Sequence, residues 1–174
     1  SEAEKVRKDL KDIADDLHRV SERVLREDER LLKRLHDVSR DVRERDREIV
    51  EDLRRGGISK TLLKEVERLS EESKRKLDKL NEEVRRLSEE SRKRLKDLND
   101  ELREIVRRVK ETVDSGDDRE EVLDRARKEV DEIKKKHKKV LDESRKLVAE
   151  AERKHEEILK ESEDLAREIK ERER

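Results

Sequence analysis

The sequence predicts an all-α protein: a straight, antiparallel three-helix bundle with little or no supercoil. Apolar residues recur at helical spacing along the 174-residue chain. Two short glycine-containing segments divide the chain into three parts of similar length, and in each part similar residues return after 18 positions. Eighteen residues complete about five turns of an undistorted helix, whereas a heptad repeat would impose a left-handed supercoil.

The first helix is expected over residues 2–54. Its apolar stripe contains Leu17, Val20, Val24, Leu31, Leu35, Val38 and Val42. Asp28 and Asp46 occupy gaps in this stripe, at positions where a buried helix face would normally present an apolar side chain. The repeat is visible in Leu17-His18 and Val20-Ser21, which return as Leu35-His36 and Val38-Ser39.

The second helix is expected over residues 60–114, after a loop at 55–59. Gly56 and Gly57 allow the left-handed backbone conformation that ends a helix, and Ser59 can cap the helix that follows. In this helix Leu69, Ser70, Ser73, Leu80 and Asn81 return as Leu87, Ser88, Ser91, Leu98 and Asn99.

The third helix is expected over residues 118–172, after a loop at 115–117 with Gly116 at its centre. His137 and Ser144 return here as His155 and Ser162. Because such short loops make successive helices antiparallel neighbours, residues 1–174 are predicted to form one bundle and a single domain.

Polar residues of the three stripes are predicted to meet in shared layers. If the helices are in step, facing residues have numbers that sum to about 115 across the first loop and about 232 across the second. Two layers then contain histidine and asparagine: His18 with Asn99 and His137, and His36 with Asn81 and His155. Two others combine aspartate with serine: Asp28 with Ser88, Ser91 and Ser144, and Asp46 with Ser70, Ser73 and Ser162.

These layers have two interpretations. Several of the polar residues follow an apolar residue by one position and would simply contact water at the edge of the stripe. We favour buried hydrogen-bond networks, because complementary donors and acceptors share one height and buried polar groups are normally paired. A slipped register would leave such groups unsatisfied, so the networks would select one packing among many.

Composition excludes several classes of function. Charged residues make up 59% of the chain and apolar residues 28%, with no long apolar run, so we expect a soluble protein without a membrane span or targeting segment. Lys and Arg number 51 against 52 Asp and Glu, and this balance is not the basic excess of a nucleic-acid-binding protein. Without cysteine or a third ligand beside each histidine pair, we expect neither a metal nor another cofactor. A thin aliphatic seam offers no pocket, so we expect no enzyme.

The repeat in all three helices, the glycine-centred loops, the aliphatic seam and the Glu, Lys, Arg and Asp surface resemble those of de novo designed helical bundles with buried hydrogen-bond networks. Natural three-helix rods such as spectrin-like repeats usually bury aromatic residues, and this chain has none. The resemblance implies a recombinant structural scaffold or interaction module that needs no partner. A switch driven by pH or by displacement of a helix is the alternative, with a partner helix or helix exchange between copies as the routes of association.

Overall fold

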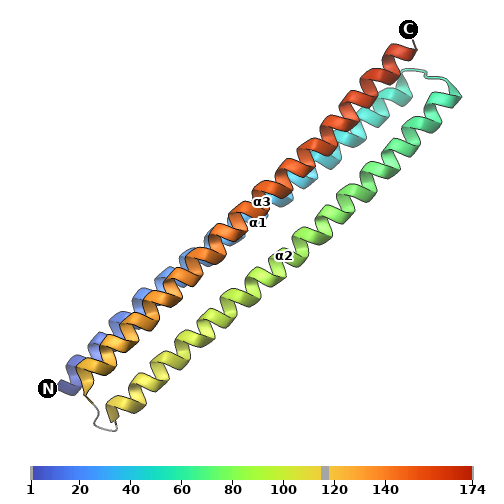
Figure 1. Cartoon of the computed structure of the whole chain (residues 1–174). Helices are drawn as coiled ribbons and strands as arrows, with labels where there is room; N and C mark the ends of the chain where they lie inside the picture. The colour runs from blue at the N-terminus through green and yellow to red at the C-terminus, as the bar shows by residue number, and fades with distance from the viewer. Residues whose placement is uncertain (1, 115–117, 174) are drawn as a thin grey trace. The chain divides into compact units, whose positions relative to one another are not determined.

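A computed structural model describes residues 2–114 and 118–173 of the chain. These residues form three α-helices and no strand: α1 spans Glu2–Arg55, α2 spans Lys60–Asp114 and α3 spans Arg119–Arg172 (Figure 1). The helices pack against one another, so the prediction of an all-α three-helix bundle is confirmed. Each described helix end lies within one residue of the expected position. The loop expected at 115–117 lies outside the described residues.

The chain divides into two compact units, and each unit contains a stretch of all three helices. Unit 1 comprises Ser1–Arg30 and Glu89–Ser144, and unit 2 comprises Leu31–Ser88 and Arg145–Arg174. The expectation of a single domain over residues 1–174 therefore stays a prediction.

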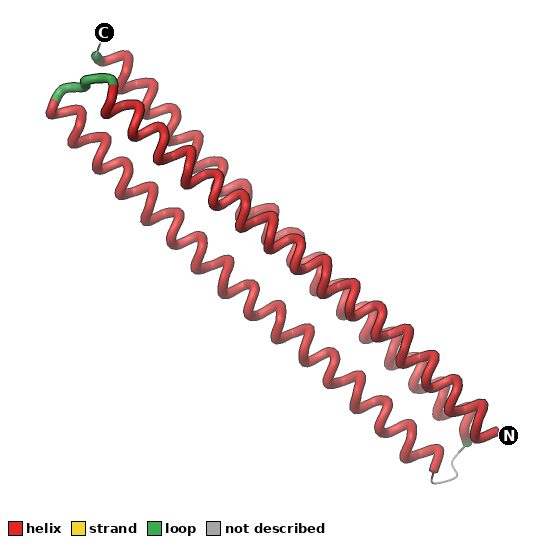
Figure 2. Tube along the Cα trace, turned by 180° about the vertical axis from the view of Figure 1, so that it is seen from behind, coloured by secondary structure: helices red, strands yellow, loops and turns green. Residues whose placement is uncertain are grey.

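The first loop ends α1 and starts α2 as the glycine and serine positions predict (Figure 2). Gly57 has a φ of 70°, the left-handed conformation that a side chain would strain. Ser59 caps α2, because its side-chain oxygen accepts a hydrogen bond from the Leu62 amide at 3.3 Å. Asp118 caps α3 in the same way, accepting from the Glu120 amide at 3.2 Å.

Side-chain contacts fix the register of the helices within each unit. Contacts between α1 and α2 join residues whose numbers sum to 119–121, such as Ser21 with Asn99 in unit 1 and Ser39 with Asn81 in unit 2. Contacts between α2 and α3 join residues whose numbers sum to 235–237. In these contacts the residue number falls along one helix as it rises along the next. The α1–α2 and α2–α3 pairs are therefore antiparallel, as predicted.

The observed register differs from the predicted sums of about 115 and 232. The residue of α1 that faces a given residue of α2 lies about five residues further along the helix than the sequence indicated. Ion pairs between α1 and α3 join residues exactly 118 apart in number, which makes these two helices parallel neighbours within each unit.

The core of both units is aliphatic. In unit 1, Leu17, Leu98 and Ile133 belong to one buried cluster that receives side chains from all three helices. In unit 2 the corresponding clusters include Leu53 with Val66, Leu35 with Val84, and Leu77 with Ile158. Because leucine, valine and isoleucine carry no polar atoms, this packing favours burial without directing the register.

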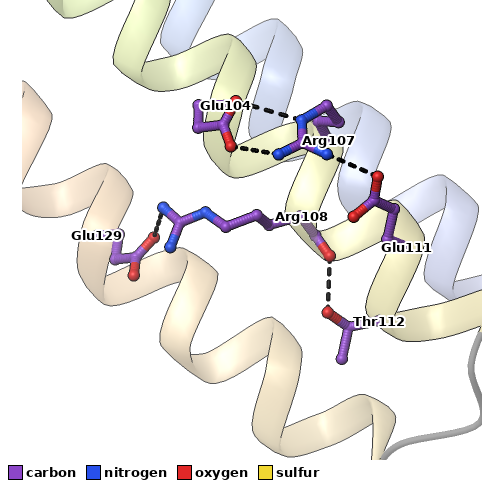
Figure 3. A network of polar contacts seen from close by, with 6 residues as sticks. All are labelled: Glu104, Arg107, Arg108, Glu111, Thr112 and Glu129. Atoms are coloured by element: carbon purple, nitrogen blue, oxygen red, sulfur yellow. Dashed lines mark hydrogen bonds and ion pairs between the residues drawn. The ribbon is translucent and has the colours of Figure 1, made fainter.

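The exposed faces are covered by ion pairs, as Figure 3 shows for part of unit 1. Arg107 contacts Glu104 and Glu111 along α2, while Arg108 reaches across to Glu129 of α3 at 3.3 Å. The hydrogen bond from Arg107 lowers the pKa of the Glu104 carboxyl and raises the pKa of its own guanidinium. Such exposed pairs support the helices but contribute little to stability.

The observed register predicts which engineered cysteines can be joined in this cysteine-free chain. The hydroxyl oxygens of Ser73 and Ser162 lie 3.2 Å apart, so sulfurs at these positions can reach bonding distance. We expect the Ser73→Cys/Ser162→Cys variant to form an intramolecular disulfide on oxidation, detected by mass spectrometry of the unreduced digest. Ser70→Cys/Ser162→Cys is the matched control, because the register with sums near 232 would pair those positions instead. A faster disulfide in the control would contradict the observed register.

Candidate functional site

The buried polar side chains of the seam form the candidate site. In unit 1, Ser21 of α1 donates a hydrogen bond from its hydroxyl to the side-chain carbonyl of Asn99 on α2, with the oxygens 2.6 Å apart. The register places His137 of α3 at the same height as Asn99. The His137 ring is completely buried, and its Nδ1 atom lies 2.9 Å from the carbonyl oxygen of Ile133. Since a carbonyl can only accept, Nδ1 carries the proton of the neutral ring and Nε2 is left as an acceptor.

The same layer recurs in unit 2 with residues 18 positions away. Ser39 donates to the side-chain oxygen of Asn81 at 2.8 Å. His155 is completely buried, and its Nδ1 atom donates to the carbonyl of Ala151 at 2.7 Å. Among the described residues, no hydrogen-bond partner lies within reach of the Nε2 atom of His137 or of His155. In each of the two layers the hydrogen bonding is therefore incomplete, because the Nε2 acceptor of the histidine has no partner among the described residues.

The prediction that His18 and His36 belong to these layers is wrong. Both are exposed: the His18 side chain is 72% accessible and its Nε2 atom lies 3.0 Å from a carboxylate oxygen of Glu22. His18 follows the fully buried Leu17 by one residue and is therefore rotated by roughly 100° away from the seam.

Ser21 and Ser39 occupy the α1 positions of the layers instead. The apolar spacing predicts Val20 and Val38 on the stripe, but these valines are half-buried at its flank. The available signal was spacing: Ser21 lies four residues after buried Leu17 and three before buried Val24, the steps of a continuous helix face.

The aspartate layer of unit 1 contains one residue from each helix. Asp28 is buried and accepts a hydrogen bond from the Ser91 hydroxyl at 3.1 Å. The Ser91 hydroxyl also lies 3.3 Å from that of Ser144, so a connected set of polar groups joins α1, α2 and α3. Predicted Ser88 is half-buried and lies three residues before Ser91 on α2.

The aspartate layer of unit 2 has the same residue types and a less complete set of partners. Ser73 and Ser162 are buried, and their hydroxyls lie 3.2 Å apart. The Oδ1 atom of Asp46 has no partner among the described residues. Burial raises the pKa of the Asp46 carboxyl, and the nearby Ser162 hydroxyl, the charge of Lys74 and the Ser73 hydroxyl offset part of this effect.

A hollow of about 430 Å³ adjoins Asp46 on the side of α1 and α2 in unit 2. Predicted Ser70 lines this hollow together with Asp46 and Lys74. Ser70 therefore lies beside the aspartate layer, at its half-buried edge, rather than between the three helices.

The side chains of these layers carry hydroxyl, amide, imidazole and carboxyl groups, all of which can form hydrogen bonds. Within residues 2–114 and 118–173, no group of three or more histidine, aspartate or glutamate side chains is placed to hold a metal ion. None of the described helices has a stretch long and apolar enough to cross a membrane.

Comparison with known proteins gives no relative from which a role could be transferred. The chain shows no significant similarity to any protein-family model, any curated protein sequence or any solved structure.

Replacing Asp46 with asparagine is expected to stabilise the protein at pH 7, on the order of 1 kcal/mol. The raised pKa means that the folded state binds a proton more tightly than the unfolded state, so stability falls as pH rises above about 3.8. Asparagine cannot ionise, so the advantage of Asp46→Asn should shrink as the pH falls below the ordinary pKa. Urea unfolding at pH 7 and pH 3 measures both values.

Asp41→Asn is the control for this prediction, because it removes the same charge from an exposed position of α1 in unit 2. Its effect should stay within about 0.5 kcal/mol. Loss of stability in Asp46→Asn at pH 7 would show that the ionised carboxylate is better satisfied than its contacts indicate.

Proposed function

We propose that the chain is a designed structural module, a helical-bundle scaffold without natural biochemical activity, whose buried polar layers specify the register of its helices. One observation carries this proposal: four polar layers recur at matched heights, two in each unit, with residues from three helices in each layer. The layers of unit 2 repeat those of unit 1 after 18 residues on every helix.

Energetics support a role in specificity over a role in stability. An aliphatic side chain at Ser21, Asn99 or His137 would bury more apolar surface in the same seam. A polar residue there costs free energy unless its partner is at the right height, and that cost penalises registers in which the two partners no longer meet. The 18-residue repeat, the aliphatic core and the short capped loops support a designed origin.

A pH-responsive switch is the second candidate, favoured by the free Nε2 atoms of the two buried histidines. A proton on Nε2 would add a charge and a donor where no described residue offers an acceptor. Protonation of a buried ring without a partner would therefore destabilise the folded state. Asp46 acts in the opposite direction, because its raised pKa favours folding at low pH.

Replacing both buried histidines with leucine should separate the two candidates. In His137→Leu/His155→Leu two unsatisfied acceptors disappear, so the free energy of unfolding at pH 7.5 should rise by about 1–3 kcal/mol per site. If the layers specify register, this variant should also give more than one set of amide resonances in its NMR spectrum. If they form a switch, the parent should lose stability between pH 7.5 and pH 5 and the variant should not.

His18→Leu/His36→Leu provides a control of identical composition, because those histidines are exposed. Guanidinium unfolding of this control should match the parent within about 0.5 kcal/mol at each pH. A stability loss of several kcal/mol in the buried variant, or equal effects in both variants, would count against a specificity role.

A further inference from the structure

In unit 2, the stretch of α3 over residues 145–172 buries fewer large aliphatic side chains than the stretches of α1 and α2 that it contacts. Among the described residues of this unit, α1 buries five and α2 buries four, whereas α3 buries Val148, Ile158 and Ile169. Its other buried apolar residues are Ala151 and Ala166, and its two leucines, Leu147 and Leu165, are exposed. Apolar burial therefore holds this stretch of α3 less strongly than its neighbours.

Two buried polar atoms of unit 2 have no partner among the described residues, and both lie in layers to which α3 contributes. They are Nε2 of His155, which is an α3 residue, and Oδ1 of Asp46 in the layer that contains Ser162 of α3. A buried acceptor without a partner costs its desolvation free energy, and that cost is relieved when the helices separate and water reaches the atom. Both atoms thus lower the free energy needed to detach residues 145–172.

The surface of α1 and α2 that this stretch covers has an aliphatic centre. Leu35 of α1 and Val84 of α2 cluster with Val148, and Val42 and Leu77 cluster with Ile158. We call this surface of unit 2 the docking surface. Because its aliphatic residues come from two helices, an aliphatic helix face placed along it is buried from both sides.

Ion pairs at the rim of the docking surface indicate which helix fits it. In three of them the cation belongs to α1 or α2 and the carboxylate to α3: Arg34–Glu152 at 2.6 Å, Arg45–Glu163 at 3.8 Å and Lys76–Glu161 at 3.2 Å. A further pair has the opposite polarity and joins Glu65 of α2 to Arg172 at 3.1 Å. Carboxylates at three fixed positions beside an aliphatic face therefore complement this surface.

We propose that the docking surface binds a helix of another molecule in place of residues 145–172. The partner is an amphipathic helix with alanine and aliphatic residues along one face and carboxylates at the positions of Glu152, Glu161 and Glu163. Leucine at the position of His155 removes the unpaired acceptor and adds an aliphatic side chain, so such a helix competes well with α3. This exchange goes beyond the scaffold role, and it depends neither on a designed origin nor on how the layers specify register.

The test uses a synthetic, fluorescein-labelled peptide with the sequence of residues 145–172 and leucine in place of His155. Fluorescence anisotropy should show saturable binding of this peptide to the full chain. A matched peptide with lysine in place of Glu152, Glu161 and Glu163 should bind at least about tenfold more weakly, because it brings like charges together at the rim.

Two variants of the protein distinguish exchange from binding at another place. The attached α3 competes with the peptide at a high effective concentration. Ile158→Ala weakens the attached helix without changing the docking surface, so the peptide should bind this variant at least about tenfold more tightly than the parent. Glu156→Ala changes an exposed residue of the same helix and should leave the affinity within about twofold of the parent. Circular dichroism verifies that both variants are helical.

Three results would overturn the proposal. The first is the absence of peptide binding to both the parent and Ile158→Ala. The second is equal affinity for these two proteins, which would place the peptide outside the docking surface. The third is equal affinity of the parent for the acidic and the lysine-substituted peptide, and this comparison holds even if Ile158→Ala does not fold.

Discussion

The requirement that a buried polar group meet its partner at the same height governs this structure. Leucine, valine and isoleucine fill the seam in almost any register at a similar gain of apolar contact. The hydroxyl of Ser21 has a partner only where Asn99 lies opposite, and Asp28 has one only where Ser91 does. The aliphatic side chains thus hold the helices together, while a few short hydrogen bonds determine how the helices are aligned.

Much of the fold follows from local chemistry that the sequence displays directly. Gly57, Ser59 and Asp118 fix the helix ends because left-handed backbone and capping are properties of single residues. Register is different, because it depends on how the loop residues turn and on which side chains interlock. Because the predicted register of α1 was wrong by about one turn at this layer, the predicted layer contained His18 where the structure has Ser21. Whether the Nε2 atoms of His137 and His155 have a hydrogen-bond partner depends on interatomic distances, which the spacing of residues along the sequence does not give.

The two units show that a repeated sequence does not give repeated sites. Asp28 and Asp46 occupy equivalent positions, with serines at equivalent places on α2 and α3. Yet Ser91 donates to Asp28 at 3.1 Å, while one oxygen of Asp46 has no partner among the described residues and a hollow adjoins its carboxyl. Small differences in side-chain placement, and neighbours such as Lys74, decide whether the same residue types satisfy one another.

The 18-residue period has a consequence for errors of assembly. Sliding one helix past its neighbours by one or two turns separates every donor from its acceptor. Sliding it by a whole period restores one pairing in every two with different members, because serine again faces serine and serine again faces asparagine where the periods still overlap. The polar pairs therefore oppose a slip of one whole period less strongly than a slip of one or two turns. A slip of 18 residues is prevented by the loop between α1 and α2. This loop contains only residues 56–59, which is too short to span such a displacement.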